Sequence, residues 1–144
     1  MSRIADILAV KGSTVHRVAP DTSAHDAIAS MVEQGVGSLL VTQGEEIVGI
    51  FTERDYLRRV LLKDLDGRAT RVREVMTARI VCVESSRAVE DCMSIMTRQR
   101  FRHLPVVENG RLAGIISIGD LVKHLSSARE VEIAFLTEYI TGRT

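Results

Sequence analysis

Two pairs of residues in this chain, each a hydroxyl and a carboxylate, are suited to chemistry. Thr52 follows an apolar run with Asp55 three positions later, and Ser117 with Asp120 repeats this spacing further along the chain. Such a pair is typical of a capping box, in which hydroxyl and acid bond to each other's backbone N–H at a helix start. The same residues suit a ligand, because a helix N-terminus attracts phosphate and a carboxylate accepts hydrogens from a ribose diol. Both interpretations stay open, since duplication would copy a helix cap too.

The elements that must position these pairs come from an internal repeat. Residues 18–59 align without a gap with residues 83–124, with nine identities in 42 positions and apolar residues matching almost throughout. Each copy has the pattern strand, helix, strand, strand, helix. The predicted strands are 15–18, 38–42 and 47–51 in the first copy, and 80–83, 103–107 and 112–117 in the second.

Local signals support this assignment in both copies. In the first copy, Ser23 caps a helix and Gly35 ends it. In the second, 108–110 is Glu-Asn-Gly, a strong hairpin signal. The helix between Ser23 and Gly35 carries an apolar stripe at helical spacing: Ala24, Ala27, Ile28, Met31 and Val32. A second helix is predicted over residues 53–62.

One copy alone has a small core and two sheet faces to cover. The sequence therefore predicts an α/β fold, in which two β-α-β-β-α units pack sheet to sheet with pseudo-twofold symmetry and leave a cleft along the joint. The expected boundaries are 1–66 for the first repeat, 67–126 for the second and 127–144 for an amphipathic C-terminal helix. That helix packs either on its own domain or against a dimer partner.

Composition excludes several classes of function. Lys plus Arg and Asp plus Glu both number 19, so the net charge of zero provides no overall basic field for nucleic acid. No apolar run suggests a membrane span, and the first residues do not resemble an export signal, so a cytoplasmic protein is expected. Cys82 and Cys92 are interpreted as buried thiols. The four histidines are scattered, so no metal site is expected, and no nucleophile–base pair suggests an enzyme.

The paired Gly-Ile-x-Thr/Ser-x-x-Asp endings, together with Arg-His-Leu-Pro-Val-Val at 102–107, resemble a tandem pair of CBS domains, the Bateman module. The resemblance extends over residues 4–125. It implies a regulatory, usually homodimeric module that binds adenosine-containing ligands: AMP, ADP, ATP or NAD(H), with S-adenosylmethionine ranked below them. This chain resembles the stand-alone members, whose regulated protein partner the sequence does not name.

Carried onto this sequence, the resemblance implies two binding sites between the repeats. The aspartates would hold ribose, the hydroxyls and helix starts phosphate, and the neighbouring strand backbone the adenine. The first site would use Thr52, Arg54, Asp55, Ile80, Val81, Phe101, Arg102 and His103. The second would use Val15, His16, Val36, Gly37, Ser117 and Asp120.

The two sites are not equivalent in sequence. The first copy has Glu53 and Arg54 where the second has Ile118 and Gly119, so a cation is missing from the second motif. Unequal affinities or two different ligands are therefore expected. The alternative function is a module that binds protein or nucleic acid without a small-molecule ligand. Such a module would ignore free nucleotides and, with a polynucleotide, show strong salt dependence.

Overall fold

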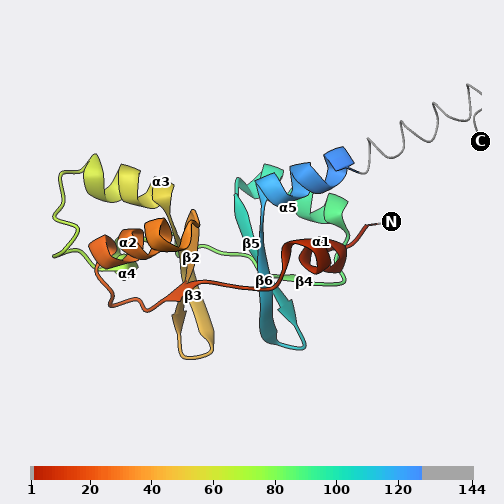
Figure 1. Ribbon diagram of the computed structural model, residues 1–144, viewed down its shortest axis with the longest axis horizontal. Coiled ribbons are helices and arrows are strands. Elements are labelled where there is room, and N and C mark those ends of the chain that lie inside the picture. Colours follow the sequence, from red (N-terminus) through yellow and green to blue (C-terminus); the bar gives the residue numbers. More distant parts are fainter. Residues whose placement is uncertain (1, 128–144) are drawn as a thin grey trace, which may run out of the picture. The chain divides into compact units, whose positions relative to one another are not determined.

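A computed structural model describes residues 2–127 and shows a mixed α/β chain with two three-stranded sheets (Figure 1). The chain divides into two compact units, and each is described by itself. We call residues 14–81 the first-repeat unit. Among the described residues, 2–13 and 82–127 form the second-repeat unit.

The first-repeat unit is built on one sheet with the strand order β1-β2-β3. Strand β1 pairs with β2 in parallel, and β2 with β3 in antiparallel fashion. The core forms where Ala24, Met31, Leu39, Phe51 and Val72 pack together. The elements are β1 (Arg17–Val18), α2 (Ala24–Gln34), β2 (Ser38–Gln43), β3 (Glu46–Thr52), α3 (Glu53–Tyr56), the π-helical turn η1 (Leu57–Leu61) and α4 (Val72–Val75).

The second-repeat unit has the same topology, with strand order β4-β5-β6. Its hairpin turns at Asn109 and Gly110, both with positive φ, as the sequence signal predicts. The elements are α1 (Ile4–Lys11), β4 (Val83–Glu84), α5 (Val89–Gln99), β5 (His103–Glu108) and β6 (Arg111–Ser117). A further helix begins at Ile118 and continues to the last described residue, Ser127.

Each unit is completed by the segment that precedes the other repeat. Helix α1 packs with the second repeat, where the N–H of Ile4 donates to the carbonyl of Arg87 at 2.9 Å. Residues 67–81, including α4, pack with the first repeat, where the N–H of Val72 donates to the carbonyl of Thr22 at 2.8 Å. Helices of four or eight residues are not stable alone in water, so each needs a core against which to bury its apolar side. The compact units therefore differ from the repeat boundaries 1–66 and 67–126.

Several local predictions are confirmed, and others need correction. Ser23 caps α2, and Gly35 ends it in the left-handed conformation. Val32, expected in the buried stripe, is 76% exposed because it lies one residue beyond buried Met31 and points off the core face. Cys92 is buried as predicted, whereas Cys82 is exposed because it precedes β4 instead of lying within it. The C-terminal helix predicted for 127–144 lies almost entirely outside the described residues.

Candidate functional site

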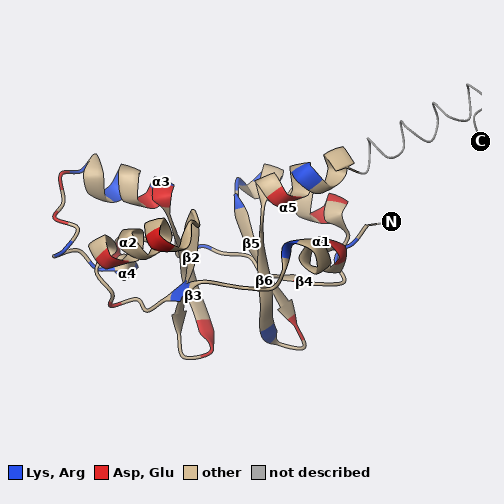
Figure 2. Ribbon diagram, in the orientation of Figure 1, with Lys and Arg blue, Asp and Glu red and all other residues tan. Residues whose placement is uncertain are grey.

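The first motif closes a complete capping box where β3 passes into α3. The hydroxyl of Thr52 accepts from the N–H of Asp55 at 3.1 Å, and the Asp55 carboxylate accepts from the N–H of Thr52 at 3.0 Å. The first turn of α3 contains two acidic residues, and the ribbon is red there in Figure 2. Negative charge in the first turn of a helix is favoured by the helix dipole. The structural interpretation of the motif is therefore correct for this copy.

Asp55 also ties the first repeat to the segment that follows α4. The Thr77 hydroxyl donates to the Asp55 carboxylate at 3.1 Å, and the Arg59 guanidinium lies 4.0 Å from the same carboxylate. Arg59 donates in addition to the carbonyl of Met76 at 2.7 Å. Asp55 is only 8% exposed. This carboxylate is thus a buried junction of α3 with residues 76–77, in addition to its role in the cap.

The second motif repeats the capping box where β6 ends. Ser117 accepts from the N–H of Asp120 at 3.1 Å, and Asp120 accepts from the N–H of Ser117 at 2.8 Å. The partner of the carboxylate differs from that in the first motif. Here the Lys11 ammonium, from the last turn of α1, lies 2.7 Å from the Asp120 carboxylate and donates also to the carbonyl of Ile115 at 2.7 Å. A charged contact replaces the hydroxyl contact that Thr77 makes in the first motif.

The surroundings of Asp120 shift its titration. Burial by itself raises the pKa of this carboxyl, but the hydrogen bonds from Lys11 and Ser117 and the positive charge of Lys11 outweigh burial. The pKa of Asp120 therefore lies below its ordinary value. The carboxylate is ionised at neutral pH and can accept further donors, since a carboxylate offers about four lone-pair sites.

Within each unit, a backbone hydrogen bond joins the first residue of the helix that starts at the motif to the residue just before the middle strand of the sheet. The N–H of Glu53 donates to the carbonyl of Gly37 at 3.1 Å, and the N–H of Ile118 donates to the carbonyl of Arg102 at 3.0 Å. The structure thus brings Gly37 beside the Thr52 motif and Arg102 beside the Ser117 motif. The resemblance implies the opposite grouping, with Arg102 at the site of Thr52 and Gly37 at the site of Ser117. That grouping across the repeats stays a prediction.

The remaining predicted site residues lie in irregular segments or at strand starts. Val15 and His16 directly precede β1, and Ile80 and Val81 lie between α4 and β4; all four are half-buried. In the first-repeat unit, Val36 is half-buried and Arg54 is exposed on α3. In the second-repeat unit, Phe101 and His103 are half-buried, and Arg102 is exposed.

Sequence reasoning missed Lys11, Thr77 and Arg59 as partners of the two aspartates. The repeat alignment hides Lys11 and Thr77, because it begins after α1 and ends the first repeat before Thr77. Gly49 and Gly114 open the two repeated motifs, and a glycine in a strand leaves room for a ligand or another backbone. A Cβ on Gly49 would meet the sulfur of Met76 at 2.7 Å and the carbonyl oxygen of Thr77 at 2.8 Å. At Gly49 this room is occupied by Met76 and Thr77, which follow α4.

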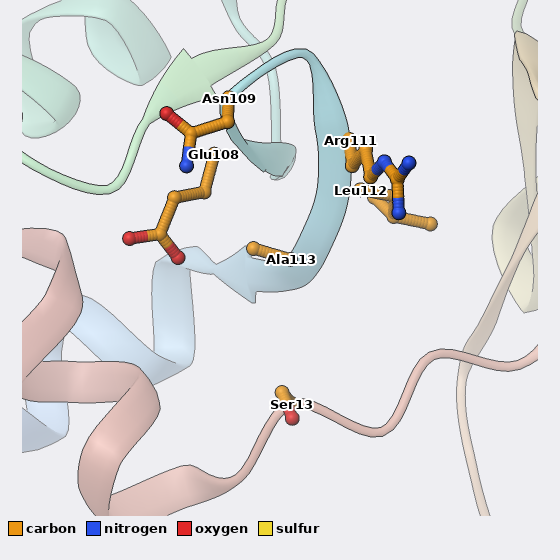
Figure 3. A pocket seen from close by; sticks show the side chains of 6 residues that line it. All are labelled: Ser13, Glu108, Asn109, Arg111, Leu112 and Ala113. Atoms are coloured by element: carbon orange, nitrogen blue, oxygen red, sulfur yellow. The ribbon is translucent and has the colours of Figure 1, made fainter.

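An open depression lies at the turn end of the β5–β6 hairpin, and no residue of either motif lines it. Its volume is about 640 Å³, and it is lined by Ser13, Glu108, Asn109, Arg111, Leu112 and Ala113. In Figure 3, Glu108 and Asn109 lie on one side of the hairpin and the Arg111 side chain points away from them. Its polar groups therefore do not converge as those of a specific small-molecule site would.

Residues 2–127 contain neither a metal-binding cluster nor a membrane-spanning helix. No group of three or more histidine, cysteine or acidic side chains within this range is arranged to hold a metal ion. Among the helices of the same range, none has the length and apolar character needed to cross a membrane.

Comparison with known proteins gives consistent results. The family model of the CBS domain matches residues 6–62 and 72–127. The chain is 33% identical over 148 residues to the CBS domain-containing protein CBSX3, mitochondrial, of Arabidopsis thaliana, an alignment that covers 96% of this chain and 72% of that protein.

Solved structures resemble the chain as well. A putative signal-transduction protein with CBS domains from Burkholderia ambifaria is 47% identical with a TM-score of 0.81, covering 86% of this chain and 93% of that one. CBSX2, solved in complex with AMP, is 28% identical with a TM-score of 0.69, covering 90% and 99%. Because the family model matches both repeats over most of the sequence, this chain belongs to the CBS-domain family as a tandem pair.

Proposed function

We propose that this CBS pair is a regulatory module that binds an adenine nucleotide at its Thr52–Asp55 and Ser117–Asp120 motifs. The ligand is AMP, ADP, ATP or NAD(H), with S-adenosylmethionine ranked below them. The module senses the energy or redox state through this ligand and passes the signal to a protein partner. It carries out no catalysis itself.

The observation that carries this proposal is the matched geometry of the two motifs. In both, a strand ends at a hydroxyl residue, a helix starts, and an ionisable carboxylate occupies the third helical position. Helix starts favour phosphate, and carboxylates accept ribose hydroxyls. AMP contains both groups at a fixed separation, so one molecule can address both features of a motif.

The comparisons support the choice of ligand class. CBS pairs are regulatory modules, and CBSX2, which resembles this chain over 90% of its length, was solved with AMP. The lining implied by the resemblance, with residues of both repeats at each site, is part of the proposal. Unequal sites are also part of it, because Arg54 has no counterpart in the second motif and, of the two motif aspartates, Lys11 bonds to Asp120.

The proposal includes a homodimer. Leu57 and Leu61 lie on η1 and Leu65 just after the turn that follows it, and they are each about half exposed, at 49%, 55% and 47%. On the helix after Ser117, Ile118 and Val122 are 40% and 51% exposed. Side chains of this kind lower their free energy by leaving water, and a second copy of the chain would bury them.

A thermal-melting screen tests the ligand class. At 100 times its dissociation constant, a ligand stabilises the folded state by about 2.7 kcal/mol, which corresponds to roughly 8 °C for a chain of this size. We expect such a shift with at least one of AMP, ADP, ATP and NAD(H), and a smaller one with cytidine monophosphate, which shares the ribose and the phosphate. Absence of a shift with every adenine ligand would overturn the proposal and favour the alternative, an interaction module without a small-molecule ligand.

A further inference from the structure

The two motif aspartates are held in place with different strength. The Asp55 side chain is 11% exposed, its carboxylate accepts from Thr77, and Arg59 donates to the adjacent carbonyl of Met76. The Asp120 side chain is 24% exposed, and the ammonium of Lys11, from helix α1, contacts its carboxylate. The Asp120 carboxylate is therefore the more accessible of the two, and its charged partner is a partly exposed lysine.

Lys11 connects this carboxylate to helix α1. It occupies the last turn of α1, and its side chain is 34% exposed. Its ammonium bridges Asp120 on the helix after β6 and the carbonyl of Ile115 within β6. The cation also lies at the negative end of the α1 dipole. A single flexible side chain thus links the end of α1 to the second motif.

We propose that Lys11 is a releasable latch on the Asp120 site: a ribose diol takes the place of the lysine ammonium on the carboxylate and frees the C-terminal turn of α1. This inference rests on the proposed function of the motif. At the Asp55 site the close partner is the uncharged hydroxyl of Thr77, and the nearest cation, Arg59, stays 4.0 Å from the carboxylate and donates instead to the carbonyl of Met76. Lys11 therefore sets the affinity of one site only.

The physical basis is competition for one oxygen: a ribose diol that pairs each hydroxyl with one carboxylate oxygen needs Oδ2 of Asp120, which already accepts from Lys11. A partly exposed ion pair contributes up to about 1 kcal/mol, so a diol that must displace it binds about fivefold more weakly than it would to a free carboxylate. Coupling between two events is reciprocal. If the ammonium weakens the ligand, the ligand must also weaken the attachment of Lys11, and α1 responds to occupancy of the site.

The test is a titration of AMP into Asp55→Asn protein, in which the first site is weakened about tenfold and the Asp120 site dominates binding. Lys11→Met removes the ammonium and keeps a chain of similar length, and we expect it to tighten AMP binding about fivefold. Lys63→Met is the matched control, because it removes the same charge from an exposed position in the other unit. We expect that control to leave the dissociation constant unchanged. Lys11→Gln serves as a second variant if the methionine disturbs folding.

Hydrogen exchange provides the second measurement. AMP is expected to speed exchange of the Gly12 amide, which bonds to the carbonyl of Leu8 at the end of α1. AMP affinity that is unchanged or weaker in Lys11→Met, or slower exchange at Gly12, would overturn the latch while the proposed function stands. If Asp55→Asn protein binds no AMP with either residue at position 11, the proposed function of the second motif fails, and the latch fails with it.

Discussion

Replacing Gly49 by alanine is expected to lower the free energy of unfolding by about 3 kcal/mol, as for an overpacked core. The added Cβ would stand 2.8 Å from the carbonyl oxygen of Thr77, a backbone atom, and 2.7 Å from the sulfur of Met76. The Thr77 backbone cannot yield locally, because its N–H and carbonyl are both bonded to Ile50. Chemical denaturation of the purified variant measures the loss.

Gly114→Ala is the matched control, because Gly114 holds the equivalent place in the second repeat. There the new Cβ meets Leu8 only at its side-chain methyl carbons, at 2.8 and 3.2 Å. Such a side chain can rotate away, so we expect a loss of about 1 kcal/mol. Equal losses for the two variants would contradict the close backbone approach described at Gly49.

Asp55→Ala is expected to cost about 3 kcal/mol of unfolding free energy. The substitution removes the charged acceptor of the Thr52 N–H and leaves the hydroxyl of Thr77 without its partner. A hydrogen bond to a charged group contributes about 1.5–3 kcal/mol, and the half-buried Thr77 hydroxyl left without this acceptor adds to the loss. The measurement is again chemical denaturation, monitored by circular dichroism.

Two further variants distinguish the loss of the Asp55 hydrogen bonds from the mere loss of one negative charge. Asp91→Ala removes an exposed acid that pairs with Arg87 on the surface, and its cost is expected to stay within about 0.5 kcal/mol. Asp55→Asn keeps an oxygen that can accept from Thr52, so its cost is expected to be about 1 kcal/mol. An Asp55→Ala protein as stable as Asp91→Ala would show that Asp55 is not a structural junction.

The sequence was sufficient for the elements whose signals are local. Ser23 and Gly35 bound α2, and the turn at Asn109 and Gly110 forms as expected, because caps and tight turns depend on neighbouring residues alone. The short strands were predicted less well. The β1 strand covers only Arg17–Val18 of the predicted 15–18, although His16 still accepts a hydrogen bond from Leu40. Strand propensity does not determine where a short edge strand such as β1 stops pairing with its neighbour β2.

The exchange of α1 and α4 between the repeats could not be predicted. Both helices bury apolar residues, and the two repeats share nearly the same apolar pattern. The sequence therefore does not indicate against which repeat each helix packs, because that depends on the path of the chain in three dimensions. The same reason explains the partners of the aspartates. The spacing of Thr52 and Asp55 predicts the capping box, whereas Thr77 and Lys11 reach their carboxylates only through the exchange.

The most direct test of the central claim, that the two motif aspartates hold the ribose of an adenine nucleotide, is an equilibrium titration with AMP. It compares the wild-type chain with the variant that carries both Asp55→Asn and Asp120→Asn. Losing a hydrogen bond to a charged acceptor costs at least about 1.5 kcal/mol, so the double variant is expected to bind AMP about tenfold or more weakly. The 2′-deoxy analogue of AMP should bind the wild-type chain with a comparable loss. If the double variant binds AMP with the wild-type dissociation constant, the ribose does not contact these aspartates and the central claim is wrong.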